Sequence, residues 1–318
     1  MRDQRPPRVY DLFCGMGGLS YGFSESGFET VGFDISTKAG KTYSQNRVGG
    51  FIRMNLMRSE IRGKCDVMVG GPPCEPWSCL NLTRRKRKHP GYVCLSRFFD
   101  FVRSSKPLLF VMENVPSVRR DPVFDAEIGR MNPCYDIDTR VVRYSDHGAA
   151  TARRRLFAVG IRRELETKVS EFLDQIEHKE PSTVRQAIGH LKSRDMDASI
   201  DHVWPRVRTI QRYTKYYRTG KFGWYILDWD KPAPSFGNIC KTYILHPDSF
   251  DGGDTRPISV REALGIVGFP ETFRFPAGIG LVSKYEMIAD TVSPLFSVRL
   301  AESVWRLLRG NPDTDNVA

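Results

Sequence analysis

A cysteine held between prolines is the residue best suited to covalent chemistry in this sequence. Residues 70–78 read Gly-Gly-Pro-Pro-Cys-Glu-Pro-Trp-Ser and place Cys74 shortly after the apolar run 67–69. The two glycines allow a tight turn, and the prolines stiffen the backbone that presents the thiol. Cys74 is therefore a candidate nucleophile, and an ordinary loop cysteine after a strand is the alternative.

A glutamate in a similar position is the second candidate. Glu113 follows the apolar run 108–112, which has the length of a buried strand. The carboxyl ends of the strands in an open α/β sheet carry its ligands and chemistry, so we expect Glu113 on the same rim as Cys74. A carboxyl group beside a nucleophile can act as a general acid, whereas a surface acid or a helix cap is the alternative.

Two arginines alternate just before another apolar run. Arg153 and Arg155 precede residues 156–161, which we expect to form a strand. Successive side chains of a strand point to opposite faces, so these two share a face. Both could therefore hold one anionic or carbonyl-rich ligand.

A glycine-rich turn near the start of the chain predicts a cofactor site. The segment 14–18, Cys-Gly-Met-Gly-Gly, separates a predicted strand at 8–13 from a predicted helix at 19–26. Glycines let backbone amides approach a ligand closely, and Asp34, at the end of a strand predicted at 30–33, could accept hydrogen bonds from a ribose. Together these features favour an adenosine-containing cofactor. The glycine spacing is not that of a dinucleotide-binding loop.

The elements that position these residues indicate an α/β domain followed by a different kind of segment. The remaining predicted elements are a strand at 140–144 and helices at 95–104, 260–267 and 283–308. The alternation of strands and helices stops near residue 182, and between Trp204 and Trp224 aromatic residues interleave with basic ones. This composition is typical of a nucleic-acid surface, although aromatic strands in a small core would look similar.

Composition and charge indicate which kinds of binding partner to expect. The net charge of +11 over 318 residues favours a polyanion. A basic run at 84–88 could form a flap that closes over phosphates, or only a solvated loop. The seven cysteines lack paired metal-ligand spacing, so we expect no metal site and reduced thiols in a cytoplasmic protein. No apolar run approaches the ~20 residues needed to span a bilayer.

Taken together, the motifs resemble the cytosine-C5 DNA methyltransferases of the prokaryotic or phage modification-methylase type. The matching segments are the cofactor motif at 11–18, the Pro-Cys motif at 71–74, the Glu-Asn-Val motif at 113–115, the paired Arg153 and Arg155, and Arg256 with Arg261-Glu262-Ala263. The resemblance implies an α/β fold, with a Rossmann-like S-adenosylmethionine-dependent methyltransferase domain at 1–181. It also implies a smaller target-recognition domain at 182–280 and a C-terminal segment at 281–318 that packs back on the catalytic domain.

The resemblance also implies an activity. Cys74 would add to C6 of a cytosine flipped out of double-stranded DNA, so that C5 can take the methyl group of S-adenosyl-L-methionine. Protonated Glu113 would hydrogen-bond N3, Arg155 would hold the base carbonyl O2, and Arg153 would hold nearby groups or phosphate. We expect a monomer, for which a restriction endonuclease acting on the same site is a further possible partner.

The remaining site residues follow from the same resemblance. Those expected to contact the cofactor are Phe13, Cys14, Gly15, Met16, Gly17, Gly18, Asp34, Ile35, Asn55, Leu56 and Pro73. Those expected to contact DNA are Ser78, Arg84, Arg85, Lys86, Arg87, Lys88, Arg206, Arg208, Arg212, Arg218, Lys221 and Arg256. The chain departs from the family pattern at Thr151, which replaces a glutamine, at Asn55, which replaces an acid, and at Ala289-Asp290, which replaces Gly-Asn.

Three other functions are compatible with parts of the pattern. An RNA methyltransferase of the same family would carry Cys-Phe-Thr where residues 235–238 read Ser-Phe-Gly-Asn. A non-catalytic DNA-binding relative would not need Cys74, Glu113, Arg153 and Arg155 together. A nicotinamide oxidoreductase would need a different glycine spacing.

Overall fold

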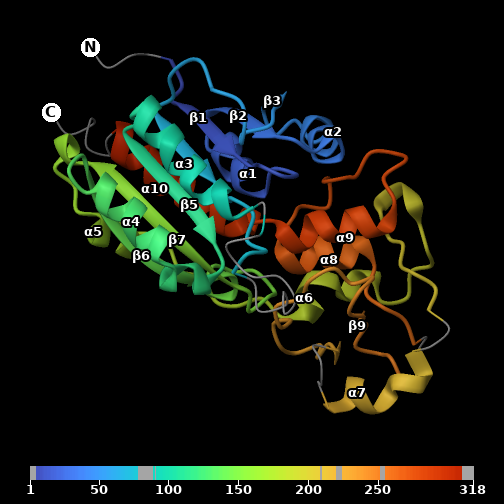
Figure 1. Ribbon diagram of the computed structural model, residues 1–318. Helices are drawn as coiled ribbons and strands as arrows, with labels where there is room; N and C mark the ends of the chain where they lie inside the picture. Colours follow the sequence, from blue (N-terminus) through green and yellow to red (C-terminus); the bar gives the residue numbers. More distant parts are fainter. Residues whose placement is uncertain are drawn as a thin grey trace, which may run out of the picture. The chain divides into compact units, whose positions relative to one another are not determined.

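The computed structural model describes residues 5–77, 89, 91–207, 210–219, 224–250 and 255–309, except for the side chain of Gln211. The chain folds into two compact units (Figure 1). The first unit contains residues Met1–Val142, Arg154–Glu177 and Ser297–Ala318, and the second contains Arg143–Arg153 and His178–Phe296.

A seven-stranded sheet forms the centre of the first unit. Its strands are β1 Arg8–Leu12, β2 Glu29–Asp34, β3 Gly50–Arg53, β4 Val67–Gly70, β5 Leu109–Asn114, β6 Tyr135–Arg143 and β7 Arg154–Arg162. They are arranged in the order β3-β2-β1-β4-β5-β7-β6. The pairs from β3 to β5 are parallel, and β7 runs antiparallel to β5. The chain order reverses between β1 and β4, which is where ligands bind in open α/β sheets.

The central strands form because their sequences are apolar on both faces. Every residue of β4 and β5 is buried, as expected for strands covered by helices on both sides. The helices of this unit are α1 Gly18–Glu25, α2 Thr37–Gln45, α3 Tyr92–Ser105, α4 Pro122–Met131, α5 Val169–Asp174 and most of α10 Pro294–Arg309. On one side, Phe98 and Phe99 of α3 pack edge-on against Phe110 of β5.

Helix α10 completes the first unit from the far end of the sequence. The Ser297 hydroxyl donates to the backbone oxygen of Leu19 in α1. A Cβ placed on Gly22 would lie only 2.1 Å from the backbone carbon of Ser297. Glycine at position 22 is therefore required for the backbones of α1 and α10 to approach this closely.

The second unit contains short elements with little sheet. Its helices are α6 Val184–Ile188, α7 Thr214–Thr219, α8 Val260–Val267 and α9 Leu281–Asp290, and its strands are β8 Tyr225–Ile226 and β9 Ile244–Leu245. A capping box begins α8, in which the Ser259 hydroxyl accepts from the Glu262 amide and the Glu262 carboxylate accepts from the Ser259 amide. Gly268 ends the helix with a positive φ of 103°.

The C-terminal part differs from the sequence-based expectation. We predicted one helix over 283–308, but α9 ends at Asp290 and α10 begins at Pro294. A proline fits the first turn of a helix and not its interior, which explains the break. The Tyr285 hydroxyl in α9 donates to the oxygen of Ile258 at 2.7 Å, so α9 belongs to the second unit. The chain therefore rejoins the first unit at Ser297 and not at residue 281.

Candidate active site at the carboxyl edge of the sheet

Three loops leave the sheet side by side at its carboxyl edge. Leu12 at the end of β1 pairs with Gly70 at the end of β4, and Gly70 pairs with Met112 in β5. The loop after β1 is the glycine-rich turn, the loop after β4 carries Cys74, and β5 ends in Glu113 and Asn114. The parallel register thus explains why residues distant in sequence share one edge.

Cys74 lies on a loop that is tied to the neighbouring strand. Its thiol forms no disulfide with another described cysteine and is of intermediate exposure. Asn114 is fully buried and donates from Nδ2 to the carbonyl oxygen of Pro72 at 2.9 Å. Our sequence reading gave Asn114 no role, although its place after Glu113 was a usable signal. The bond fixes the Cys74 loop to the strand that carries Glu113.

Glu113 forms an ion pair at the same edge. Its Oε1 lies 3.0 Å from Nε of Arg155, and both side chains are largely buried. Glu113 pairs with Phe157 of β7 in the antiparallel register, which brings the start of β7 to the end of β5. A Cβ placed on Gly71 would lie 2.9 Å from Oε2 of Glu113. The absence of a side chain at position 71 therefore leaves room for the second carboxylate oxygen.

Arg153 behaves differently from Arg155. It is 3% exposed, and its guanidinium donates to the backbone oxygens of Ala289 and Phe236. The side chain thus contacts carbonyl groups inside the second unit, and the prediction that Arg153 holds substrate groups or a phosphate stays untested. One of its partners is Ala289, which departs from the family pattern.

The glycine-rich turn is held by an acid from the next strand. Asp34 accepts from the Gly15 amide at 2.9 Å through Oδ2 and from the Ser36 amide at 2.8 Å through Oδ1. Phe13, Gly15 and Gly17 all have positive φ, at 58°, 54° and 94°. The phenylalanine has to be held in this conformation by its surroundings, since only glycine adopts it easily.

The space around the turn is closed on one side and open on the other. A Cβ on Gly17 would lie 2.7 Å from the Tyr43 ring, whereas a Cβ on Gly15 would meet no heavy atom within 4 Å. The turn is thus closed by Tyr43 on one side and open at Gly15. Ile35 is 59% exposed next to Asp34, as expected for an apolar residue that a ligand covers. Burial raises the pKa of the Asp34 carboxyl, although hydrogen bonds from backbone amides oppose this.

Other residues predicted to contact the cofactor are placed in different ways. The side chains of Cys14 and Met16 are buried, so only their backbone atoms are available to a ligand, and burial raises the pKa of the Cys14 thiol well above its usual value. Leu56 is also buried. Asn55 accepts from the Met57 amide at 3.0 Å, which leaves its Oδ1 one further lone pair. Gly18 is the first residue of α1, and Pro73 is half-buried before Cys74.

Asp11 is an acid that the sequence reading did not assign a role. It lies within β1, is 1% exposed and accepts a 2.5 Å hydrogen bond from Ser20. Burial raises its pKa to about 7, against the Ser20 hydrogen bond, and the charges of Asp34 and Glu113 add to the shift. A charged residue inside an apolar strand was the signal that could have drawn attention to it.

The sequence as a whole matches one protein family. A model of C-5 cytosine-specific DNA methylases matches residues 7–306. The chain belongs to this family. The predicted resemblance is confirmed, and the chain is in the enzyme class of DNA (cytosine-5-)-methyltransferases.

Relatives match the methylase over most of its length. Type II methyltransferase M.FnuDI of Fusobacterium nucleatum is 27% identical over 319 residues, which cover 90% of each protein. Type II methyltransferase M.MthTI of Methanothermobacter thermautotrophicus is 28% identical, covering 95% of the methylase and 98% of the relative. The solved structure of EhMeth from Entamoeba histolytica covers 95% of the methylase and 98% of its own chain, with a TM-score of 0.71 at 17% identity. The predicted Rossmann-like α/β fold is confirmed.

The predicted DNA contacts of the methylase are only partly within the described residues. Ser78, the basic run 84–88, Arg208 and Lys221 lie outside them, so these predictions stay untested. Arg206, Arg212 and Arg218 are exposed. Their exposure is compatible with contact to a phosphate or a base edge.

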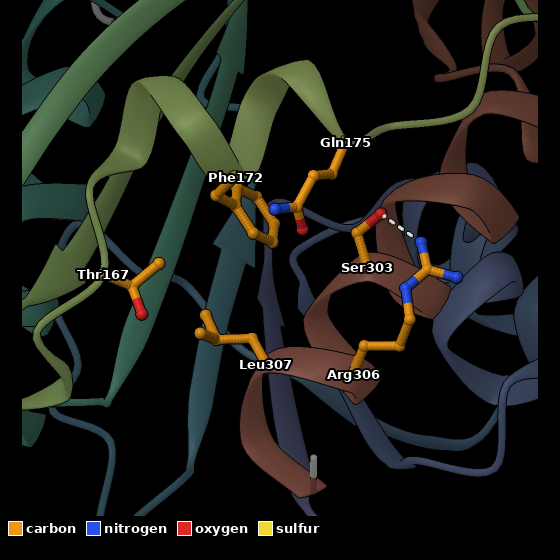
Figure 2. Close-up of a pocket in the computed structure, with 6 residues that line it drawn as sticks. All are labelled: Thr167, Phe172, Gln175, Ser303, Arg306 and Leu307. Carbon is orange, nitrogen blue, oxygen red and sulfur yellow. Dashed lines mark hydrogen bonds between the residues drawn. The ribbon is translucent and has the colours of Figure 1, made fainter. Parts of the chain in front are cut away.

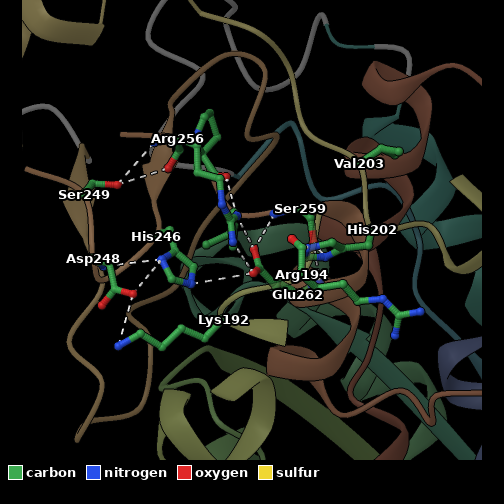
Figure 3. A network of polar contacts seen from close by, with 12 residues as sticks. Lys192, Arg194, His202, Val203, His246, Asp248, Ser249, Arg256, Ser259 and Glu262 are labelled. Atoms are coloured by element: carbon green, nitrogen blue, oxygen red, sulfur yellow. Dashed lines mark hydrogen bonds and ion pairs between the residues drawn. The ribbon is translucent and has the colours of Figure 1, made fainter. Parts of the chain in front are cut away.

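Arg256 is the exception, since it is a buried part of the second unit. Its two Nη atoms lie 2.8 and 2.7 Å from the carboxylate oxygens of Glu262 (Figure 3). Its guanidinium also stacks over the Trp204 ring, 4.3 Å from the ring centroid. The structure therefore gives Arg256 an internal role, and its contact with DNA stays a prediction. Burial alone would raise the pKa of Glu262, but the hydrogen bonds and charge of Arg256 hold it below its usual value.

Two histidines extend this polar network. His246 lies 3.7 Å from Glu262, and His202 shares a 2.9 Å hydrogen bond with Ser259 (Figure 3). Burial lowers the pKa of both histidines, against the nearby charge of Glu262. The network holds the start of α8 in place.

A separate cavity of about 730 Å³ lies elsewhere on the first unit. It is lined by Thr167, Phe172, Gln175, Ser303, Arg306 and Leu307, which come from the region of α5 and from α10 (Figure 2). None of the predicted site residues lines it. Among the described residues no group of His, Cys, Asp or Glu could hold a metal ion, and no helix is long and apolar enough to cross a membrane.

Proposed function

We propose that the chain methylates C5 of a cytosine in double-stranded DNA, with Cys74 as the nucleophile and S-adenosyl-L-methionine as the methyl donor. The observation that carries this proposal is the joining of the Cys74 loop to the strand of Glu113 through Asn114 and Pro72. That bond brings a thiol and a carboxyl group to one edge of the sheet, beside the turn that fits a nucleoside.

Cys74 supplies the covalent step. C5 of cytosine is a weak nucleophile, but addition of the Cys74 thiolate at C6 converts the ring to an enamine whose C5 can accept a methyl group. S-adenosyl-L-methionine, when bound, supplies that methyl group. Loss of the C5 proton and breakage of the bond between Sγ and C6 then restore the aromatic ring and the thiolate.

Glu113 and Arg155 hold the base during this addition. Glu113 in its protonated form donates to N3 and offsets the charge that develops as the thiolate adds. Arg155 binds the base oxygen O2. The 3.0 Å contact between Arg155 and Glu113 keeps both groups at the same place, and Gly71 leaves space for the carboxylate oxygen that faces away from the arginine.

Access to these groups requires a base outside the duplex. A stacked cytosine cannot bring C6 to a thiol on a strand-end loop, so the enzyme has to flip its target nucleotide, as methyltransferases acting on duplex DNA do. The second unit is the proposed DNA-recognition part, because it carries the exposed basic side chains of Arg206, Arg212 and Arg218. The relatives are type II methyltransferases, so we also propose a restriction endonuclease that shares the recognised site.

The residues that would hold the cofactor are those around the glycine turn. Backbone amides from Gly15 to Gly18 would face its methionine part, and Asp34 would accept from the ribose hydroxyls with the lone pairs that its amide contacts leave free. Phe13 and Ile35 would cover the adenine, and the remaining lone pair of Asn55 would accept from the adenine amino group.

A covalent trap tests the proposal. Duplex DNA carrying 5-fluorocytosine should form a stable adduct with the wild type, because fluorine cannot leave C5 as a proton does. Cys74→Ala should form no adduct and transfer no methyl groups, while still binding the cofactor. Cys134→Ala, which removes an exposed thiol, is the matched control and should behave as the wild type does. Methyl transfer by Cys74→Ala, or adduct formation with tRNA but not with duplex DNA, would contradict the proposal.

A further inference from the structure

A buried carboxylate joins three segments next to the Cys74 loop. Asp121 is 5% exposed and is the N-cap residue of α4. Its Oδ2 accepts from the indole nitrogen of Trp77 at 2.8 Å, and its Oδ1 accepts from the Tyr92 hydroxyl at 2.7 Å and from the Val123 amide at 3.1 Å. A buried carboxylate needs such donors, because its desolvation is otherwise costly.

Both the backbone and the side chain of Trp77 are held by contacts. Its amide donates to the Cys74 oxygen at 3.0 Å and so closes a turn over residues 74–77. Its own oxygen accepts from the Ser117 hydroxyl at 2.6 Å. The indole is 2% exposed and stacks on the Tyr92 ring, with centroids 5.4 Å apart. Trp77 is thus a rigid point three residues after the nucleophile.

The other side of Cys74 is anchored as well. Asn114 holds the oxygen of Pro72, two residues before the nucleophile. The backbone is therefore held on both sides of Cys74. Asn114 holds it at Pro72, and Asp121 holds it at Trp77. Small errors in the position of a reacting group can reduce a rate about a hundredfold, so the two anchors are expected to matter for the chemical step.

We propose that Asp121 is a positioning residue that sets the place of the Cys74 thiol through Trp77. This inference rests on the proposed role of Cys74 as nucleophile. It goes further by assigning a function to an acid that contacts neither the base nor the cofactor and lies 44 residues from Trp77 in sequence.

The substitution Asp121→Asn tests the charge and geometry of this contact with almost no change in volume. The introduced amide has one oxygen and one nitrogen, whereas Trp77, Tyr92 and Val123 together require acceptors at both positions. If the oxygen caps α4, the amide nitrogen faces the indole N–H. We expect the rate of adduct formation with 5-fluorocytosine DNA in a single turnover to fall at least about tenfold, with little change in DNA or cofactor affinity.

A second substitution distinguishes positioning from general damage. Trp77→Phe removes the indole N–H and keeps a ring to stack on Tyr92. In the Asp121→Asn background it removes the clash between two donors, so the double variant should form the adduct faster than Asp121→Asn alone. A purely structural loss would instead make the double variant worse than either single variant.

Glu127→Gln is the matched control on the same helix. Glu127 is also buried, at 2% exposure, and binds Arg103 at 2.7 Å and Arg130 at 2.9 Å. Its substitution should lower the melting temperature without slowing adduct formation by the folded protein. Equal slowing by Glu127→Gln and Asp121→Asn, or no slowing by Asp121→Asn while the wild type is trapped, would overturn the inference. A wild type that is not trapped at all would overturn the proposed role of Cys74 and, with it, this inference.

Discussion

At the scale of single residues, the active-site edge depends on the absence of a side chain at position 71. A methyl group there would lie 2.9 Å from Oε2 of Glu113, closer than ordinary contacts allow. We expect Gly71→Ala to displace the carboxyl group and to lower kcat at least about tenfold, with a smaller effect on KM for DNA. Steady-state methyl transfer measures both.

Gly129→Ala is the control for that substitution. Gly129 lies inside α4, where a Cβ would meet no atom within 4 Å. Alanine there should raise the free energy of unfolding by about 0.5–1 kcal/mol and leave kcat unchanged. Unchanged kcat in Gly71→Ala as well would show that Glu113 has more room than the structure indicates.

Asp11 makes stability depend on pH. Its pKa is about 7 when folded and near 4 when unfolded, so the folded state keeps a proton that the unfolded state has already lost. Stability from this group is complete below about pH 4 and is lost as pH rises through about 7. Asp11→Asn removes the dependence and keeps an oxygen for Ser20. We therefore expect the unfolding free energy of the variant, relative to that of the wild type, to rise by about 3 kcal/mol between about pH 5 and about pH 8.5. Denaturant titrations at several pH values measure this difference. If the unfolding free energies of the variant and the wild type changed in parallel with pH, the raised pKa of Asp11 would be contradicted.

The pair of Arg256 and Glu262 should affect stability and not DNA affinity. Removing the arginine leaves a buried carboxylate without its cation, which typically costs about 3–5 kcal/mol. We expect Arg256→Met to be destabilised to this extent in chemical denaturation, and Glu262→Gln in the same chain to recover part of the loss. Arg206→Ala, which removes an exposed basic side chain, should leave the free energy of unfolding unchanged. A stable Arg256→Met protein with a shallower salt dependence of DNA binding would instead show that Arg256 contacts DNA.

At the scale of elements, α7 and the short 3-10 helix before it, Ile210–Tyr213, carry the best candidates for DNA contact. Tyr217 is buried with Ile210 and Leu245, so the helix is fixed by one face. Arg212, Lys215 and Arg218 are exposed around it. The basic residues are therefore presented by an anchored element and not by a free loop.

Single alanine substitutions at Arg212, Lys215 and Arg218 should separate two kinds of contact. A phosphate contact should weaken binding to all sequences and reduce the salt slope by about 1, whereas a base contact should relax preference at one position by about 1–3 kcal/mol. Lys64→Ala is the control, because Lys64 is exposed before β4, at the opposite edge of the sheet. If sequencing of methylated sites and binding at several salt concentrations show no effect of the three substitutions, recognition lies elsewhere in the second unit.

The sequence predicts elements well where burial gives a simple pattern. Strands β4 and β5 were visible because each contains a run of buried apolar residues, and the ends of these runs located Cys74 and Glu113. Helix α2 was missed because its buried residues include Gly40 and Thr42, which give no apolar periodicity. Contacts between distant segments, such as Asp121 with Trp77, leave no local pattern at all, and neither does the burial of Arg256.

At the scale of the whole molecule, the second unit is built from two stretches of chain. The short segment Arg143–Arg153 leaves the first unit between β6 and β7, and His178–Phe296 forms the rest. A composition change near residue 182 marked the longer insertion, but a segment of eleven residues between two strands is too short to change composition. The net charge of +11 is also a property of the whole molecule. It favours a fast association with DNA whose rate depends on salt concentration.

The close packing of α1 on α10 also bears on the synthesis of the chain, because these two helices come from opposite ends of the sequence. Gly22 and Ser297 touch through their backbones, and Arg309 donates to the backbone oxygen of Arg5. A chain emerging from the ribosome therefore presents β1 and the glycine turn long before the helix that covers them. The first unit has to wait, with one side of its core open, until the whole second unit has been translated. Nascent chains are thus expected to be open to chaperones and proteases for most of synthesis, and we expect a chain truncated before α10 to be degraded and not to modify DNA.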